Sequence, residues 1–397
     1  MSVNAPEHGS GIYYTGTYWN DYPAVQAAIH RRLSGDPDTG WMMHFFRTTG
    51  SRPFRHALVL NCGNGHVERD LLRLGMVLKA TSVDYAEDLL DEARAAALAE
   101  NLPIAYHRMD TNTAAFPDGD YDLVVNSAAG HHIARIDRVF RKVCELLPDE
   151  GWFVSFDYVG PHRNQYPWDQ WNAADEVNER APAALKQVMS YPHLPTMLAT
   201  DPTEAIHSEL IVEMLTRYFE VRELRPLGGE IAYLLLTHNA ALADAAVSTR
   251  DAWIEEVLAA DEARLRTNPE GTLFAYAAAQ PKKEVLKDVA RLAGWAEEED
   301  RRETAVADRD GMYYPLSLLQ RLHLHTSSIQ TQNDGLRHDM RRLESEVNSL
   351  RDQLVQSSMM PKLTRHALAE LERRGRRLYR VGRRGVGRVR RRLRRTP

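Results

Sequence analysis

The sequence has few cysteines and no long apolar run. Only two of its 397 residues, Cys62 and Cys144, are cysteine, too few for a disulfide framework or a cysteine-built zinc site. It contains no stretch of about 18 apolar residues that would span a bilayer, and residues 1–10 lack the apolar core of a signal peptide. We therefore expect a cytoplasmic protein, and no motif predicts a metal site.

Charge is distributed unevenly along the chain. The net charge of −5 combines two opposed parts, because residues 361–397 hold 15 Lys and Arg against two Glu. That tail carries a net +13, which leaves −18 for residues 1–360. An acidic body and a polybasic tail suit different partners.

One stretch organises the first half of the chain. Residues 58–60 form a short apolar run typical of a strand buried on both faces. Gly63 and Gly65 follow, and glycine lets the backbone turn sharply and lets a ligand approach closely. Apolar residues then recur at helical spacing over residues 67–72. A strand, a glycine turn and a helix together indicate a nucleotide-binding site.

Acidic residues follow at the ends of the next strands. Residues 78–83 read as a second strand that ends at Asp84, 21 residues after Gly63, where a ribose-binding carboxylate is expected. A third strand, residues 104–109, ends at Asp110, and residues 121–126 read as a fourth. The succession LNCGNG, VDY, MD, YDLVVNSAAGHHI and LLPDEGWFV resembles the class I S-adenosylmethionine-dependent methyltransferases over roughly residues 50–280.

The resemblance implies an α/β, Rossmann-like fold with seven strands, and a small-molecule or glycan-associated bacterial branch of the family. The remaining strands are expected at residues 219–223, 231–236 and 272–278, with a helical insertion at 250–266. The predicted organisation, in chain order, is an N-terminal helical cap (1–50), the methyltransferase domain (51–283), a charged helical linker (284–317), a coiled coil (318–357) and a basic amphipathic tail (358–397).

The resemblance also implies which residues bind S-adenosylmethionine. The turn after the first strand would wrap the methionine end, Asp84 would accept hydrogen bonds from the ribose, and the residues after the second and third strands would contact the adenine. The alternative role for Asp84 and Asp110 is helix capping. The predicted cofactor-binding set is Asn61, Cys62, Gly63, Asn64, Gly65, Asp84, Tyr85, Met109, Asp110 and Asn126.

Two positions depart from the family pattern. Val59 stands where the family usually has an acid that orients the methionine portion, and Asn61 stands where it usually has glycine. Asn adopts left-handed backbone angles better than most residues, so the turn is expected to form. The loss of the acid leaves open a non-catalytic descendant of the fold.

His131 and His132 follow the fourth strand and are the candidate catalytic residues. A hydroxyl acceptor needs its proton removed, and a histidine with a pKa near 6.5 suits that role. A carboxylate acceptor needs alignment alone, and the alternative reading is that both rings pack or cap a helix. The Asn-Pro-Pro-aromatic motif of nitrogen-directed enzymes is absent, which argues against a base-flipping DNA methyltransferase.

A further segment is a candidate for acceptor specificity. Tyr166, Trp168 and Trp171 could stack on sugar faces, and Arg163 could bind an acid or a phosphate. The alternative is a structural cap over the sheet edge. Aromatic residues before the first strand, such as Trp19 and its neighbours, could likewise form a lid over the cofactor or a plain packed cap.

The C-terminal region predicts assembly and recruitment. From Leu319 to Leu354, nine of the eleven positions at alternating spacings of three and four are apolar, which predicts a coiled-coil homodimer. The alternative is one long helix packed on the body. The arginine-dense tail suits an anionic membrane surface at the inner face or, less favoured, a nucleic acid.

We therefore predict a methyltransferase that acts on an oxygen of a small molecule or saccharide. The alternatives are an RNA-modifying methyltransferase anchored by the tail, and a non-catalytic scaffold that keeps the fold and oligomerises through the heptads.

Overall fold

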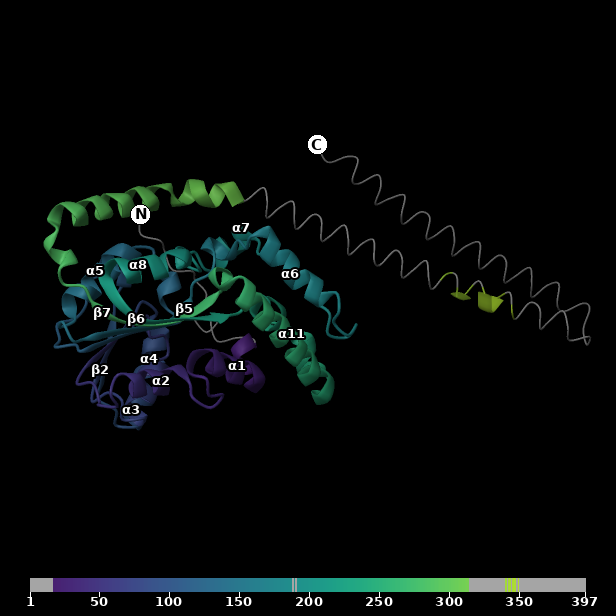
Figure 1. The fold of residues 1–397 in the computed structure, drawn as a ribbon, viewed down its shortest axis with the longest axis horizontal. Helices are drawn as coiled ribbons and strands as arrows, with labels where there is room; N and C mark the ends of the chain where they lie inside the picture. Colours follow the sequence, from purple (N-terminus) through teal and green to yellow (C-terminus); the bar gives the residue numbers. More distant parts are fainter. Residues whose placement is uncertain are drawn as a thin grey trace, which may run out of the picture. The chain divides into compact units, whose positions relative to one another are not determined.

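The computed structural model describes residues 17–187, 189 and 191–313, together with residues 340, 342–343, 345–347 and 349. The chain divides into two compact units, residues 1–321 and residues 322–397. The first unit is a layered α/β domain with helices on both faces of one sheet (Figure 1).

The sheet has seven strands in the order β3-β2-β1-β4-β5-β7-β6. The first five are parallel, and β7 runs antiparallel between β5 and β6. This is the Rossmann-like architecture that the sequence predicts. The strands are β1 (Ala57–Leu60), β2 (Ala80–Asp84), β3 (Ile104–Arg108), β4 (Leu123–Ser127), β5 (Trp152–Tyr158), β6 (Phe219–Gly228) and β7 (Phe274–Pro281).

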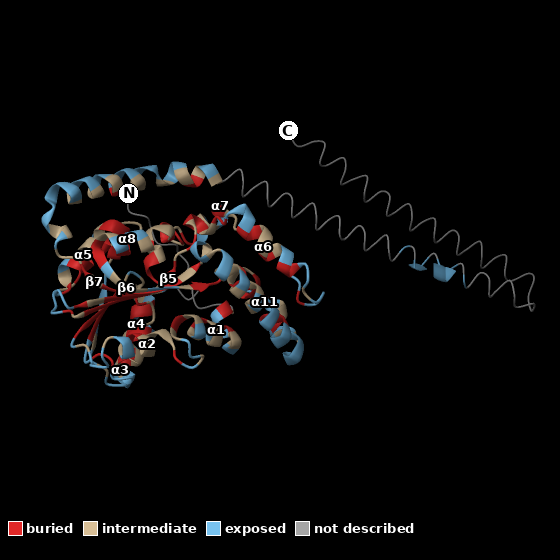
Figure 2. Ribbon diagram, in the orientation of Figure 1, coloured by how far each residue is buried: buried red, intermediate tan, exposed pale blue. Residues whose placement is uncertain are grey.

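Helices cover both faces because successive side chains of a strand point to opposite sides. In β1, Ala57 and Val59 belong to one apolar cluster, whereas Leu58 and Leu60 belong to the other. Buried residues accordingly line both sides of the sheet (Figure 2). The helices are α1 (Pro23–Ser34), α2 (Trp41–Thr48), α3 (His66–Arg73), α4 (Glu87–Ala99), α5 (Ile136–Leu146), α6 (Trp168–Asn178), α7 (Leu194–Thr200), α8 (Ile211–Tyr218), α9 (Ala232–Leu236), α10 (Ala240–Asp244) and α11 (Val247–Thr267).

The predicted strand at residues 231–236 is wrong, because these residues form helix α9. Its start is fixed by the buried carboxylate of Asp261 on α11, which accepts hydrogen bonds from the backbone N–H groups of Gly229, Ile231 and Ala232 at 2.9–3.0 Å. A carboxylate that satisfies the first N–H groups of a helix stabilises it. The predicted helical insertion is present as α11.

The N-terminal helices pack on the antiparallel side of the sheet. The guanidinium of Arg32 on α1 donates to the carboxylate of Asp261 at 2.8 Å and to the carbonyl of Leu227 at 2.7 Å. Trp19 is buried, and its ring lies 5.0 Å from that of Phe274. These contacts make the described N-terminal residues part of the domain core.

The charged segment after β7 is helical, and it packs on the domain. A helix covers residues 289–313 and lies beside α5 and α8 (Figure 1). Its Glu299 accepts from the backbone N–H groups of Asp137 (2.8 Å) and Arg138 (3.2 Å), at the start of α5. Trp295 packs edge-on against Tyr218 of α8. This segment therefore covers one face of the domain and does not form a free linker.

Most of the predicted coiled coil, and the basic tail at 358–397, lie outside the described residues. The seven described residues of this region are helical and exposed. Three of them, Met340, Leu343 and Val347, occupy heptad positions and are 45–53% exposed. The coiled coil and the homodimer remain predictions. No helix in the described ranges is long and apolar enough to cross a membrane.

Candidate functional site

The turn after β1 has the backbone geometry that its residues predict. Asn61, Gly63 and Gly65 have φ angles of 44°, 56° and 77°, all in the left-handed region. A Cβ on Gly65 would lie 2.5 Å from the Tyr106 hydroxyl oxygen, so only glycine fits where this turn enters α3. Cys62 between them is buried, and its backbone N–H donates to the carbonyl of Val83 on β2.

Asp84, at the end of β2, is bonded to this turn. One carboxylate oxygen accepts from the backbone N–H of Gly63, and the other accepts from the backbone N–H of Ala86, each at 2.8 Å. A carboxylate oxygen has two lone pairs, so each can accept one more hydrogen bond. Asp84 therefore organises the turn and can still bind ribose hydroxyls.

The residues after β2 and β3 are more open. Tyr85 is 46% exposed, and the Arg108 guanidinium lies 5.3 Å from the centre of its ring. Asp110 is exposed and caps a short helical turn, accepting from the backbone N–H of Asn112 at 2.9 Å. Met109 is half-buried beside it. The capping role considered for Asp110 is present, on the same edge of the sheet as Asp84.

Two asparagines connect this region to the loop after β4. Asn61 donates to the carbonyl of Ala129 at 3.1 Å and accepts from the Thr111 hydroxyl at 2.5 Å. Asn126 is fully buried, and its amide group donates to Asp157 at 2.8 Å. Asn126 therefore supports Asp157, whereas Asn64 lies half-buried in the glycine turn. We call residues 61–65, 84–85 and 109–110 the cofactor side.

His131 and His132 lie beside the cofactor side, in a short helical turn at residues 130–132. Asp157, at the end of β5, accepts from His131 Nδ1 and from the backbone N–H of Gly130, both at 2.6 Å. A Cβ on Gly130 would lie 2.8 Å from an Asp157 oxygen, so glycine permits this approach. Burial disfavours the Asp157 charge, but His131 and the hydrogen bonds outweigh burial and lower its pKa.

The two histidines carry different charges. Burial opposes protonation of both rings. At His131 burial is the largest single effect, but the charge and hydrogen bond of Asp157, with the charges of Glu204 and Asp201, together outweigh it and raise the pKa to about 9. At His132 burial, reinforced by the positive charge of His131, lowers the pKa. At neutral pH His131 is therefore cationic and His132 is neutral, with the proton held by the member of the pair that faces Asp157.

A loop before α8 completes this cluster. The Thr203 hydroxyl donates to Asp201 at 2.6 Å and lies 3.1 Å from His132 Nδ1. A Glu204 oxygen lies 3.8 Å from His132 Nε2 and 4.0 Å from His131 Nε2. The two rings and Glu204 thus converge, with one ligand-type atom of each within 4.8 Å of the others. We call residues 131–132, 157 and 201–204 the acceptor side.

Sequence reasoning missed the carboxylates of the acceptor side: Asp157, Asp201 and Glu204. Asp157 ends a strand of the parallel sheet, as Asp84 does, so its position at the carboxyl edge was a usable signal. The other two belong to a loop more than 40 residues later in the chain, and nothing local marks them as neighbours of the histidines.

Three of the four residues expected to bind the acceptor are buried. Tyr166 and Trp171 are 4% and 7% exposed and stack on one another, whereas Trp168 is 56% exposed. Arg163 is buried and donates to the carbonyls of Pro202 and Glu204. These contacts favour the structural-cap reading for this segment, in which Arg163 holds the loop that carries Glu204.

Comparison with known proteins gives matches across the cofactor side. Residues 58–155 match the family model described as a methyltransferase domain. EEF1A lysine methyltransferase 4 of Mus musculus is 27% identical over 138 residues, covering 29% of this chain and 53% of that protein. An uncharacterized methyltransferase of Bacillus subtilis, YcgJ, is 23% identical over 125 residues, covering 31% and 47%. The chain thus spans about half the length of the curated relatives it matches.

Solved structures give matches at low identity. The YcgJ protein of Bacillus subtilis is 15% identical, with coverage of 61% of this chain and 97% of that one, and a TM-score of 0.36. An S-adenosylmethionine-dependent methyltransferase of Mesorhizobium loti is 17% identical, with coverage of 61% and 99%, and a TM-score of 0.38.

Residues 58–155 match a methyltransferase domain, and the residues of the cofactor side fit S-adenosylmethionine as its cofactor. The left-handed turn at Gly63 and Gly65 brings bare backbone to the ligand. Asp84 retains acceptor capacity for ribose hydroxyls, and the exposed ring of Tyr85 can lie against a base.

Proposed function

We propose that this chain, which carries a class I S-adenosylmethionine-dependent methyltransferase domain, transfers the methyl group to an oxygen of a small-molecule or saccharide acceptor. The observation that supports this proposal is the pairing of a cationic His131 with a neutral His132 next to the cofactor side. A hydroxyl acceptor needs a neutral base to remove its proton, and a nearby cation stabilises the developing negative charge.

The hydrogen bonds around His132 assign its tautomer. The Thr203 hydroxyl gives its proton to Asp201, so its oxygen is available to accept from the N–H at His132 Nδ1. Nε2 is then the basic nitrogen, on the side of Glu204. His132 would take the acceptor proton at this atom, while His131, oriented by Asp157, would hold its positive charge beside the acceptor oxygen. The bound cofactor supplies the electrophilic methyl carbon.

A second acceptor class has support of its own. The relative from Mus musculus is named as a lysine methyltransferase. Asp201 and Glu204 on the acceptor side would suit an ammonium group, since carboxylates bind and orient cations. An amine also needs a neutral base before it can attack, so His132 would serve this reaction as well. The choice between oxygen and nitrogen therefore depends on the acceptor, and an acceptor screen decides it.

The scaffold alternative depends on the missing acid at Val59. Val59 is 2% exposed and packs in the apolar core. Asp84 and the glycine turn are in place without that acid. We therefore favour a functional cofactor site.

The test of the proposal uses the full chain. Calorimetric titration with S-adenosylhomocysteine is expected to give micromolar binding. Labelled S-adenosylmethionine is then offered with four acceptor panels: hydroxyl compounds and saccharides, amines including lysine peptides, carboxylates, and RNA. Transfer to the first panel supports the proposal. If the chain binds the cofactor but methylates only amines or RNA, the proposed oxygen acceptor is wrong and that class takes its place. A folded chain that binds no S-adenosylhomocysteine overturns the enzyme assignment.

We extend the proposal to assembly and recruitment. Met340, Leu343 and Val347 expose apolar surface at heptad positions, which supports a parallel homodimer through residues 319–354. The basic tail would bring this dimer to an anionic membrane surface. Deletion of residues 361–397 is expected to abolish binding to anionic liposomes and to leave methyl transfer intact. Loss of RNA binding, with liposome binding unchanged, would favour the nucleic-acid alternative.

A further inference from the structure

A second group of histidines and carboxylates lies where three segments of the first unit meet. His162 follows β5, and His207 and Glu209 precede α8. One nitrogen of each histidine and one oxygen of Glu209 lie within 4.8 Å of one another. Both histidines are 1% exposed, and their rings stack with centroids 5.5 Å apart. Helix 289–313 closes the group from a third side and contributes Glu303 and Asp310.

His207 has a buried nitrogen that none of the described residues satisfies. Its Nε2 lies 2.7 Å from an oxygen of Glu303. A carboxylate accepts only, so Nε2 carries the N–H and Nδ1 carries a lone pair. Nδ1 has no hydrogen-bond partner among the residues that the structure describes, and neither has Oε2 of Glu209. A buried acceptor without a partner costs free energy, so both atoms point to a missing ligand.

His162 has two hydrogen-bond acceptors beside its ring but only one N–H to offer them when neutral. Its Nδ1 contacts the carbonyl oxygen of Ile206, and its Nε2 lies 2.7 Å from an oxygen of Asp310. Both partners accept, but a neutral imidazole has only one N–H to donate. One of these two contacts therefore lacks a proton, and a nearby cation would offset the unfavourable pairing of lone pairs. The same cation would supply a partner to the bare nitrogen of His207.

The charges of the group favour a cation. Glu209, Glu303 and Asp310 face two arginines, because Arg309 pairs with Glu209 at 2.9 Å and Arg163 pairs with Asp310 at 3.4 Å. With neutral imidazoles, one negative charge remains in a mostly buried site, where it is costly unless it is offset. Imidazole nitrogens and carboxylate oxygens are the ligands of zinc and related ions. A carboxylate on the far nitrogen of a ligating histidine is the usual supporting contact.

We propose that His162, His207 and Glu209 bind a divalent transition-metal ion of the zinc type, with Glu303 and Asp310 as the carboxylates that contact the two histidines. The ion would join the segment after β5 to the loop that carries Glu204 to the acceptor side. It would act through structure, and the proposal holds whatever the acceptor is.

Cobalt binding tests this site directly. The untagged full chain is stripped with a chelator and titrated with Co²⁺, whose visible absorption bands report nitrogen and oxygen ligation. One Co²⁺ per chain is expected, displaced by Zn²⁺. His207→Ala and Glu209→Gln are expected to abolish binding, and Glu303→Gln to weaken it by roughly 10- to 100-fold. Circular dichroism and thermal unfolding verify that each variant is folded.

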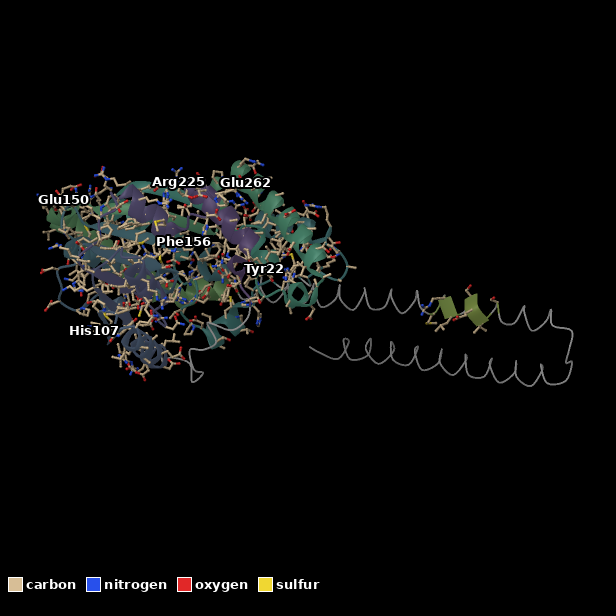
Figure 3. The ribbon with its side chains drawn as sticks, turned by 90° about the horizontal axis from the view of Figure 1, so that it is seen from below. Tyr22, His107, Glu150, Phe156, Arg225 and Glu262 are labelled. Carbon is tan, nitrogen blue, oxygen red and sulfur yellow. The ribbon has the colours of Figure 1, made fainter. Side chains whose placement is uncertain are left out.

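Two matched histidine variants locate the ion. His107 is an exposed residue at the outer edge of the sheet (Figure 3), and His107→Ala is expected to leave Co²⁺ binding unchanged. His132→Ala is expected to leave it unchanged too. A folded wild-type chain that binds no Co²⁺ would overturn the proposal. Binding lost in His132→Ala and retained in His207→Ala would also overturn it, because the ion would then lie on the acceptor side.

Discussion

The cofactor side and the acceptor side occupy the same edge of one sheet, yet they are built differently. On the cofactor side, the backbone N–H of Gly63 donates to the carboxylate of Asp84, and the backbone N–H of Cys62 donates to the carbonyl of Val83. On the acceptor side, side chains from distant loops meet: His131 contacts Asp157, and His132 contacts Thr203, 71 residues away. The first site is specified by local backbone geometry, and the second by tertiary packing.

This difference predicts that the acceptor side is the more sensitive to loss of one side chain. Asp157→Asn removes the charge that orients His131 and raises its pKa. Methyl transfer is expected to fall about 10³-fold, within the range that positioned acid–base groups contribute. Binding of S-adenosylhomocysteine, measured by calorimetry, should stay within a few-fold of wild type. An equal loss of cofactor affinity would show that the two sides are not separable.

Helix α3, which follows the glycine turn, carries a buried acid, Glu68, whose effect is on stability. Burial raises the pKa of Glu68 on α3 to about 7. The folded state therefore keeps a proton that the unfolded state releases above about pH 4.5, so stability falls as pH rises from about 4.5 to 7 and stays lower above it. Glu68→Gln is expected to remove this dependence and to stabilise the protein by about 3 kcal/mol at pH 8. Denaturant unfolding at pH 5 and pH 8 measures the free energy of unfolding of the wild type and of Glu68→Gln. If the difference in this free energy is the same at both pH values, the raised pKa of Glu68 is contradicted.

Replacing Asp84 tests whether the cofactor side binds S-adenosylhomocysteine. Asp84→Ala removes a charged acceptor for ribose hydroxyls and the bond to the Gly63 N–H. Each hydrogen bond to a charged group contributes about 1.5–3 kcal/mol, so affinity for S-adenosylhomocysteine is expected to fall roughly 100-fold. Asp110→Ala, which removes an exposed helix cap, is the matched comparison and should reduce the affinity for S-adenosylhomocysteine less than Asp84→Ala does. A larger loss of affinity in Asp110→Ala would contradict ribose binding at Asp84.

The smallest effect is expected where helix 289–313 meets α5. Glu299 accepts from two backbone N–H groups at the start of α5. Glu299→Ala is expected to lower the free energy of unfolding by about 1–2 kcal/mol, as loss of a helix cap does. Glu297→Ala, an exposed change on the same helix, is the control. A destabilisation no larger than the control's would mean that this helix does not support the domain.

The sequence predicted where the residues of the cofactor side lie in the fold, because the signals that place them are local. The positions of Gly63, Gly65 and Asp84 relative to the strands follow from turn geometry and from the rule that ligands bind at the carboxyl edge of parallel strands. The same rule placed His131 and His132 at that edge. Their partner Asp157 ends a neighbouring strand, and the rule could have found it.

The remaining features depend on contacts between distant residues. The apolar run at 231–236 fits a strand or a buried helix equally well, and Asp261, 30 residues later, selects the helix. Glu204 reaches the histidines because Arg163 and Ile206 hold its loop, the latter donating its N–H to the carbonyl of His131 at 3.1 Å. No local pattern encodes such pairings.

The most direct test of the proposed function compares two histidine variants on the acceptor that the screen identifies. His132→Gln and the surface control His107→Gln are both expected to bind S-adenosylhomocysteine as the wild type does. His132→Gln should reduce methyl transfer by about 100-fold or more, since the base is lost, and His107→Gln should transfer at the wild-type rate. Wild-type transfer by His132→Gln would contradict the account, because the acceptor would then be activated without the neutral member of the pair.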